Sequence, residues 1–240
     1  MRYVDKSSNV GLIREAELRL KLVRHYNQDD KVREIIRVLY SGCCSFCGSS
    51  PEISSFFQIE HFYPKKNKSY RKYAKDIRNL HYCCQRCNTL KGAKTHSNIF
   101  SPNFYLSGAD WLCSNSKKIE SELFFFGHLL YSRNLNYASI DRGEQTIRLF
   151  NLNNANDSGR SNRQSLVEAR LRVFATVYNL LEALYDLLSN YAPANNNAIQ
   201  MIFLIVIGYT NQTSAFHTMV VQNFGDDIFR LLYVFNRVRI

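Results

Sequence analysis

The sequence predicts an α+β fold in which a small zinc-pinned module of two strands and a helix is embedded in a mainly α-helical protein. Two Cys-x-x-Cys pairs, Cys44/Cys47 and Cys84/Cys87, bracket a segment with two β-rich stretches, and apolar residues at helical spacing fill much of the remaining chain. Two thiolate pairs of this kind are typical of a structural zinc site. We therefore expect an N-terminal helical segment (1–40), the module (41–105), a connecting region (106–162) and a C-terminal helical domain (163–240).

The helical regions are predicted from apolar periodicity. In residues 11–40, apolar residues recur every three or four positions in two runs, and Asn27-Gln-Asp-Asp30 separates them. This pattern favours two helices, with an aspartate placed to cap the second. After a polar linker (151–163), the same spacing predicts a long helix from Leu166 to Leu187 and further helices around 196–207 and 213–236. We interpret their apolar faces as core.

Within the module, Phe56–Tyr63 is β-rich, and Pro64 ends it as a strand. Residues 79–83 can supply a second strand, and a helix from Cys84 would stop at Gly92. On that helix Cys84, Asn88 and Lys91 share a face. This arrangement would bring Glu60, His61, Asn79 and Asn88 around one pocket.

Composition narrows the class of protein. A hydrophobic content of 45% is that of a globular chain, and seven cysteines, an odd number with two tight pairs, favour metal binding in a reducing cytoplasm over a disulfide framework. The polar N-terminus does not resemble a signal peptide. The longest apolar run, Met201–Ile207, is far shorter than the ~20 residues that span a bilayer, so we expect no membrane partner.

Positive charge is concentrated in the module. Residues 58–94 contain ten basic and two acidic residues, a net charge of +8 against +11 for the whole chain. Tyr70 and Tyr73 interleave with the cations, which favours contact with a nucleic-acid backbone over a merely solvated loop. The candidate nucleic-acid-binding residues are Lys65, Lys66, Lys68, Arg71, Lys72, Lys75, Arg78, Arg86 and Lys94.

These elements together resemble the zinc-stabilised form of the HNH endonuclease signature. The resemblance rests on Glu60-His61 followed by Pro64, then Asn79-Leu80, then Cys84-x-x-Cys87-Asn88-x-x-Lys91-Gly92. It covers about residues 40–95 and implies a ββα-metal unit that cuts nucleic acid with one divalent ion. It also implies that His61 is the general base, that Asn79 orients it, and that Glu60 and Asn88 bind the catalytic ion.

The chemistry of these side chains suits that assignment. Phosphodiester hydrolysis needs a deprotonated water and stabilisation of charge on the phosphate. A histidine suits the first task at neutral pH, and Mg²⁺ or Mn²⁺ held by a carboxylate and an amide oxygen suits the second. Lys91 could place another cation beside the phosphate. Soft thiolates select Zn²⁺ for the structural site, with Cys44, Cys47, Cys84 and Cys87 as its ligands.

The wider context is similar to the HNH subunits of prokaryotic anti-phage systems of the Septu and retron-associated kind. The similarity includes the helical lead into the first cysteine pair and the segment Gln145–Asn153. It implies a role in antiviral defence and an ABC-type or SMC-like ATPase partner, bound through the helical C-terminal half.

Several alternatives stay open from the sequence. Cys43 and Cys83 precede the first ligand of each pair, so a Cys-x-x-x-Cys register is conceivable. His81 and His96 are interpreted as structural or phosphate-facing. The module could bind DNA or RNA without cutting it, or the chain could be a protein-interaction subunit whose function lies in its C-terminal helices.

Overall fold

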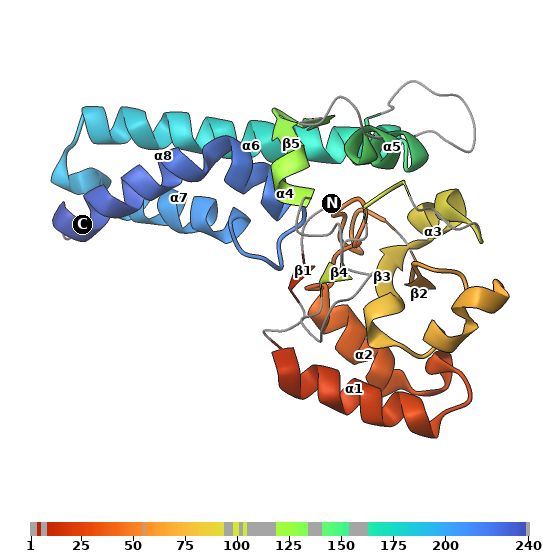
Figure 1. Cartoon of the computed structure of the whole chain (residues 1–240). Helices are drawn as coiled ribbons and strands as arrows, with labels where there is room; N and C mark the ends of the chain where they lie inside the picture. Colours follow the sequence, from red (N-terminus) through yellow and green to blue (C-terminus); the bar gives the residue numbers. More distant parts are fainter. Residues whose placement is uncertain are drawn as a thin grey trace.

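The computed structural model describes residues 4–5, 9–54, 56–93, 98–100, 103–104, 119–133, 141–153 and 163–238. It confirms a mixed fold in which a small two-stranded module lies against helices on two sides (Figure 1). Trp111, Cys113, Lys94, His96 and most of the polar linker lie outside the described residues.

The predicted N-terminal helices are present as α1 (Val10–Leu22) and α2 (Asp30–Leu39), with the 3-10 helix η2 (Tyr26–Gln28) between them. Asp29 caps α2, because its carboxylate accepts hydrogen bonds from the backbone N–H groups of Lys31 and Val32. The buried faces of α1 and α2 form one core with Ile59, Ile77 and Leu80 of the module. The N-terminal helical segment therefore packs directly onto the two strands of the module.

The module itself is a ββα unit. Strand β2 (Phe57–His61) pairs antiparallel with β3 (Leu80–Cys84), so that Glu60 faces His81 and His61 faces Leu80 across the ladder. Helix α3 (Gln85–Lys91) follows at once, and Gly92 ends it with a positive φ of 62°. The loop between the strands contains the 3-10 helices η3 (Lys68–Tyr73) and η4 (Ile77–Asn79).

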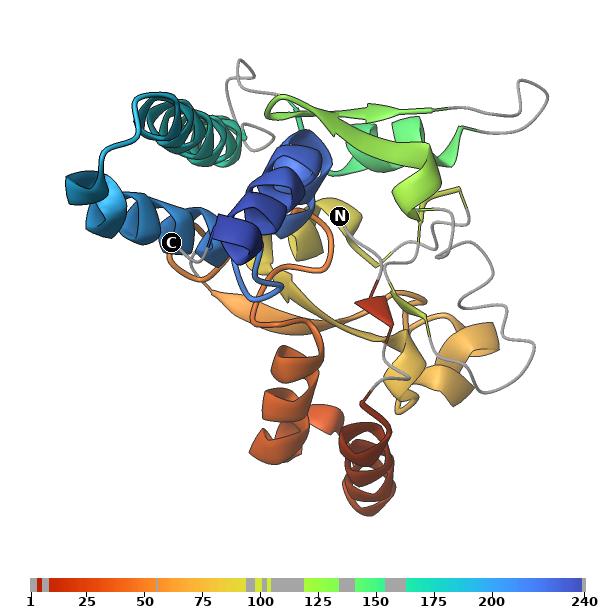
Figure 2. The same ribbon diagram turned by 90° about the vertical axis from the view of Figure 1, so that its left-hand side faces the viewer.

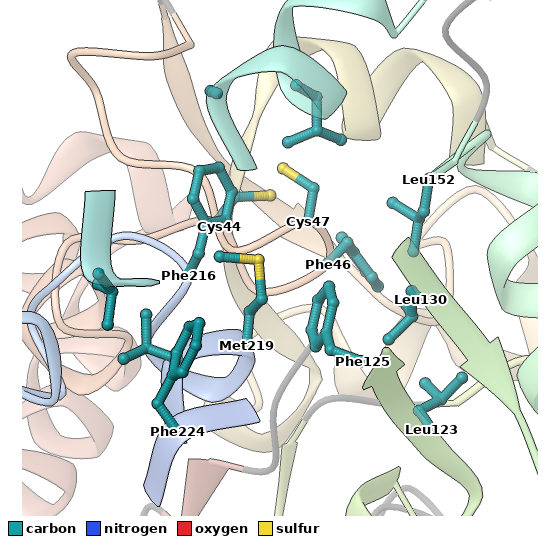
Figure 3. Packing of buried hydrophobic residues seen from close by; sticks show 14 of the residues in the cluster. Cys44, Phe46, Cys47, Leu123, Phe125, Leu130, Leu152, Phe216, Met219 and Phe224 are labelled. Carbon is teal, nitrogen blue, oxygen red and sulfur yellow. The ribbon is translucent and has the colours of Figure 1, made fainter. Parts of the chain in front are cut away.

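The C-terminal half contains α6 (Gln164–Ser189), the 3-10 helix η6 (Pro193–Asn195), α7 (Asn196–Tyr209) and α8 (His217–Val238). Its apolar faces continue into the module as one hydrophobic core. Phe216 and Met219 lie beside Cys44, Phe46 and Cys47 (Figure 3). The C-terminal helices thus pack against the cysteine cluster itself. The division into domains at the expected boundaries stays a prediction.

The connecting region contains a hairpin of β5 (Leu123–Phe126) and β6 (Leu129–Ser132), with α4 (Ile119–Glu122) before it and α5 (Arg142–Leu149) after it. Figure 2 shows the hairpin running past α8. Gln222 and Asn223 of α8 fasten it, since their side-chain oxygens accept from the backbone N–H groups of Phe125 and Gly127. A parallel pair, β1 (Val4–Asp5) and β4 (Asn103–Phe104), completes the described elements. None of the helices in the described ranges is both long and apolar enough to span a membrane.

Candidate metal centre and active site

The four cysteines selected from the sequence come together at one point. Their sulfur atoms all lie within 4.8 Å of one another, and all four side chains are buried. The sulfur atoms of Cys47 and Cys84 are 3.9 Å apart, close to the ~3.8 Å expected across a tetrahedron with Zn–S bonds of ~2.3 Å. Cys43 instead directs its sulfur at the carbonyl of Thr213, at 3.6 Å. The Cys44/Cys47/Cys84/Cys87 register therefore fits a structural zinc ion.

Two buried arginines from the C-terminal half approach this cluster. Arg163 donates to the sulfur of Cys87 at 3.5 Å. Burial disfavours its charge, but the neighbouring thiolates outweigh burial and raise the pKa of Arg163. Arg170 is fully buried, donates to the carbonyl of Leu152 at 2.7 Å, and has a pKa that burial lowers to about 10. Four thiolates around Zn²⁺ carry a net charge of about −2, so these cations compensate it.

The sequence interpretation missed both arginines. Arg170 lies four residues after Leu166 and seven before Val177, two residues of the apolar face of α6, and a charged residue on such a face was the available signal. Arg163 lies at the end of the polar linker, where a basic residue is unremarkable in sequence. Its buried position follows from packing alone.

The Glu60 carboxylate faces α3 and is already paired. Its Oε1 accepts from the ammonium of Lys91 at 2.6 Å, and Lys91 also donates to the backbone carbonyl of His61 at 2.8 Å. One turn earlier, Asn88 donates through Nδ2 to Gln58 at 2.8 Å. Strand β2 and helix α3 are therefore joined by three hydrogen bonds. Burial raises the pKa of Glu60, and Lys91 opposes that rise.

Lys91 is inside the protein, with its side chain fully buried. The sequence predicted a cation beside the substrate phosphate, whereas the structure directs this ammonium at Glu60 and His61. A role of Lys91 beside the phosphate stays a prediction, and its burial favours a role through Glu60.

The His61 imidazole is held in one tautomer. Its Nε2 lies 2.9 Å from the carbonyl oxygen of Ala74. Since a carbonyl can only accept, Nε2 must carry the proton, and Nδ1 keeps its lone pair. Burial lowers the pKa of His61 to about 4, so the ring is neutral at pH 7 and able to accept a proton.

Asn79 acts on His61 through the intervening loop. It is fully buried, and its side chain accepts from the N–H of Tyr63 and donates to the carbonyls of Tyr63 and Tyr73. Tyr73 precedes Ala74, whose carbonyl receives the His61 proton. Asn79 thus fixes the loop that orients the imidazole, because its side chain bonds to the backbone of Tyr63 and Tyr73.

The nine candidate nucleic-acid-binding residues differ in their exposure. Arg78 is held by Asp76 on the same loop, and Arg86 is half-buried beside α6, while Lys94 lies outside the described residues. The remaining six are exposed along the loop between the strands: Lys65, Lys66, Lys68, Arg71, Lys72 and Lys75. His81 is buried and bonded through Nδ1 to the hydroxyl of Tyr40 at 2.8 Å, which makes it a core residue.

Residues 44–94 match the sequence model of the HNH endonuclease family. The HNH module is also similar to the Septu protein PtuB of Bacillus mycoides (strain KBAB4), with 33% identity over 72 residues. That match covers 25% of this chain and 24% of the relative, so the chain spans about a quarter of its length. The resemblance expected from the residues is confirmed, and both findings support a nuclease or defence role.

The donor chemistry of the HNH module suits two kinds of metal. The cysteine cluster suits zinc, and within the described ranges it is the one group of three or more His, Cys, Asp or Glu side chains close enough to share an ion. Glu60 and Asn88 offer one carboxylate and one amide oxygen. Two protein oxygens suit Mg²⁺ or Mn²⁺, which keep several waters and bind substrate phosphates as well. The contact of Asn88 with Gln58 uses Nδ2, not the ligand atom Oδ1.

Proposed function

We propose that this protein is a metal-dependent endonuclease that hydrolyses phosphodiester bonds, with DNA as its substrate. The observation that supports this most strongly is the locked tautomer of His61. An imidazole whose Nε2 proton is held by the carbonyl of Ala74 keeps an unprotonated Nδ1 that can accept a proton, at the end of a strand in an HNH module.

In this mechanism, His61 takes a proton from water through Nδ1 and thereby generates the attacking hydroxide. Glu60 and Asn88 would hold Mg²⁺ or Mn²⁺, which when bound stabilises the charge that develops on the phosphate and the leaving oxygen. Lys91 keeps Glu60 ionised and fixed in orientation through its 2.6 Å contact. Asn79 fixes the loop that holds His61.

The exposed cations between the strands would bind the phosphate backbone on either side of the scissile bond. Lys72 lies over the ring of Tyr73, and the Tyr63 and Tyr70 rings lie 4.8 Å apart, so the cations are interleaved with aromatic surface. Backbone contacts carry no sequence information. We therefore propose cleavage with weak sequence preference.

We also propose that the nuclease acts in the cytoplasm as the effector of an anti-phage system, with an ATPase partner. The similarity to a Septu protein supports the defence role. The C-terminal helices expose large apolar side chains, among them Met201 and Leu204 of α7 and Phe229 of α8, which is the kind of surface that a partner covers. Co-purification with an ATPase encoded beside the gene would test this part.

The test of the nuclease is plasmid cleavage. Purified protein is incubated with supercoiled plasmid and Mg²⁺ or Mn²⁺, alongside His61→Ala, His128→Ala as a histidine control outside the module, and an EDTA control. We expect cleavage that needs the ion, is lost in His61→Ala and is retained in His128→Ala. Cleavage that survives His61→Ala in zinc-loaded protein would contradict the assignment of the base.

One observation favours a second candidate function, a zinc-stabilised module that binds nucleic acid without cutting it. The ammonium of Lys91 occupies Oε1 of Glu60, so the carboxylate already has a cationic partner. This alternative predicts retardation of DNA on a gel with no cleavage under any added metal, including after the ATPase partner is supplied.

A further inference from the structure

Tyr26 contacts the active site although it lies 18 residues before the first residue of the HNH match. Its ring meets the His61 imidazole edge-on, with centroids 5.0 Å apart and planes at 68°. Its hydroxyl donates to the carbonyl of Ile59 at 3.1 Å. Tyr26 therefore touches both the candidate base and the strand that carries it.

The segment around Tyr26 is built to hold it in place. Tyr26 begins η2, where the side chain of Gln28 accepts from the N–H of His25 at 2.9 Å. Asp29 then caps α2 and also accepts from Arg19 of α1 at 3.3 Å. The ring is half-buried against the core of α1 and α2. These contacts hold the Tyr26 ring in one position beside His61.

The contacts on His61 divide between two elements. Ala74 holds Nε2, but one hydrogen bond leaves the ring free to tilt about that contact. The Tyr26 ring packs against the imidazole in an edge-to-face arrangement and opposes the tilt. The bond to Ile59 fixes β2 immediately before Glu60 and His61. Both candidate catalytic side chains therefore depend on the position of Tyr26.

The face of the same ring also carries a cation. The ammonium of Lys65 lies 5.5 Å from the Tyr26 centroid, within the range of a cation–π contact. Lys65 is the first of the exposed cations after His61. Tyr26 thus lies between the candidate base and the start of the basic loop.

We propose that Tyr26 is a positioning residue of the nuclease site, and that the N-terminal helical segment contributes to the active site through this one side chain. The inference rests on the proposed function, since it assigns to His61 the role of base. The ring fixes the direction of Nδ1, and the hydroxyl fixes the strand. Misplacement of a reacting group by ~1 Å costs about 100-fold in rate, so loss of the ring should reduce kcat by about 10- to 100-fold.

The experiment compares four variants with the full-length, zinc-loaded protein in the plasmid assay. Tyr26→Ala and Tyr26→Leu remove the ring, and Tyr26→Phe keeps it without the hydroxyl. Leu12→Ala is the matched control, because Leu12 packs against the same core as Tyr26. We expect kcat to fall about 10- to 100-fold in the two ring-less variants with KM changed less than about 3-fold, while Phe restores most of it. Leu12→Ala should keep the wild-type kcat.

A second readout does not depend on cleavage. Long-range ¹H–¹⁵N spectra of the imidazoles, with His61 assigned from His61→Gln, report the tautomer directly. We expect the Nε2-protonated form in the wild type and in Tyr26→Phe, and a mixture of tautomers in Tyr26→Leu. Wild-type kcat and an unchanged tautomer in folded Tyr26→Leu would overturn the inference, as would a fall in kcat that Leu12→Ala reproduces. If the wild type does not cleave even with the ATPase partner supplied, the proposed function fails, whereas the spectra still show whether Tyr26 orients the His61 ring.

Discussion

Replacing Lys91 by methionine should destabilise the protein through Glu60. The Lys91 side chain is fully buried and that of Glu60 is 14% exposed, with 2.6 Å between the ammonium and the carboxylate. Removing one partner of a buried pair leaves the other charge uncompensated, at a typical cost of ~3–5 kcal/mol. The lost hydrogen bond to the carbonyl of His61 adds ~1 kcal/mol, while the partial exposure of Glu60 offsets some of the penalty. We expect the free energy of unfolding to fall by about 3 kcal/mol.

A double-mutant cycle isolates the pair. Urea unfolding of the zinc-loaded protein, followed by far-UV circular dichroism without added Mg²⁺, is measured for Lys91→Met, Glu60→Gln and the double variant. The double variant buries neither charge, so its loss should be smaller than the sum of the single losses by about 2–3 kcal/mol. Losses that add within ~0.5 kcal/mol, or a Lys91→Met loss below ~1 kcal/mol, would show that Lys91 does not compensate Glu60.

Three further predictions concern the metal centre and the base. Stripping zinc with a chelator should lower the melting temperature and unfold the module, because four cysteines then stay buried near the cations of Arg163 and Arg170 without their metal ion. An unchanged melting curve in metal-free protein would contradict this. Arg163→Met should weaken zinc binding about tenfold in competition with a chelator, whereas Arg172→Met on the exposed face of α6 should not. The pKa of His61 falls from 6.5 to about 4 on folding, so the unfolded chain binds the proton first as the pH drops. His61 should therefore lower the free energy of unfolding by up to ~3 kcal/mol as the pH falls from 6.5 to 4. His61→Gln should remove this contribution from a plot of unfolding free energy against pH.

Local rules of sequence correctly predicted several ends of helices and strands. The Asp29 cap, the β-rich run before Pro64 and the glycine stop at Gly92 each act within a few residues, so their outcome does not depend on the rest of the chain. The spacing of Asn88 and Lys91 on one helical face was likewise predictable. The partner of that face was not predictable, because the pairing of Lys91 with Glu60 requires β2 to lie against α3.

The residues that sequence reasoning missed are those supplied from far away in the chain. Tyr26 reaches His61 from before the module, and Arg163 reaches Cys87 from well after it. Neither residue belongs to a motif of regularly spaced residues, since each makes its contact as a single side chain. A single tyrosine in a short linker or a single arginine at a helix start has no local signature, and only packing gives it a role.

These distant contacts show why a short HNH module is set within a longer helical chain. A ββα unit of this size buries little surface on its own, and its charges need compensation that it does not contain. Tyr26 of η2 packs beside His61, while Arg163, the residue before α6, donates to the sulfur of Cys87 and α6 joins the module to the C-terminal core. The contact of Arg163 with Cys87 therefore links the start of α6 to α3, the helix that also carries Asn88 and Lys91.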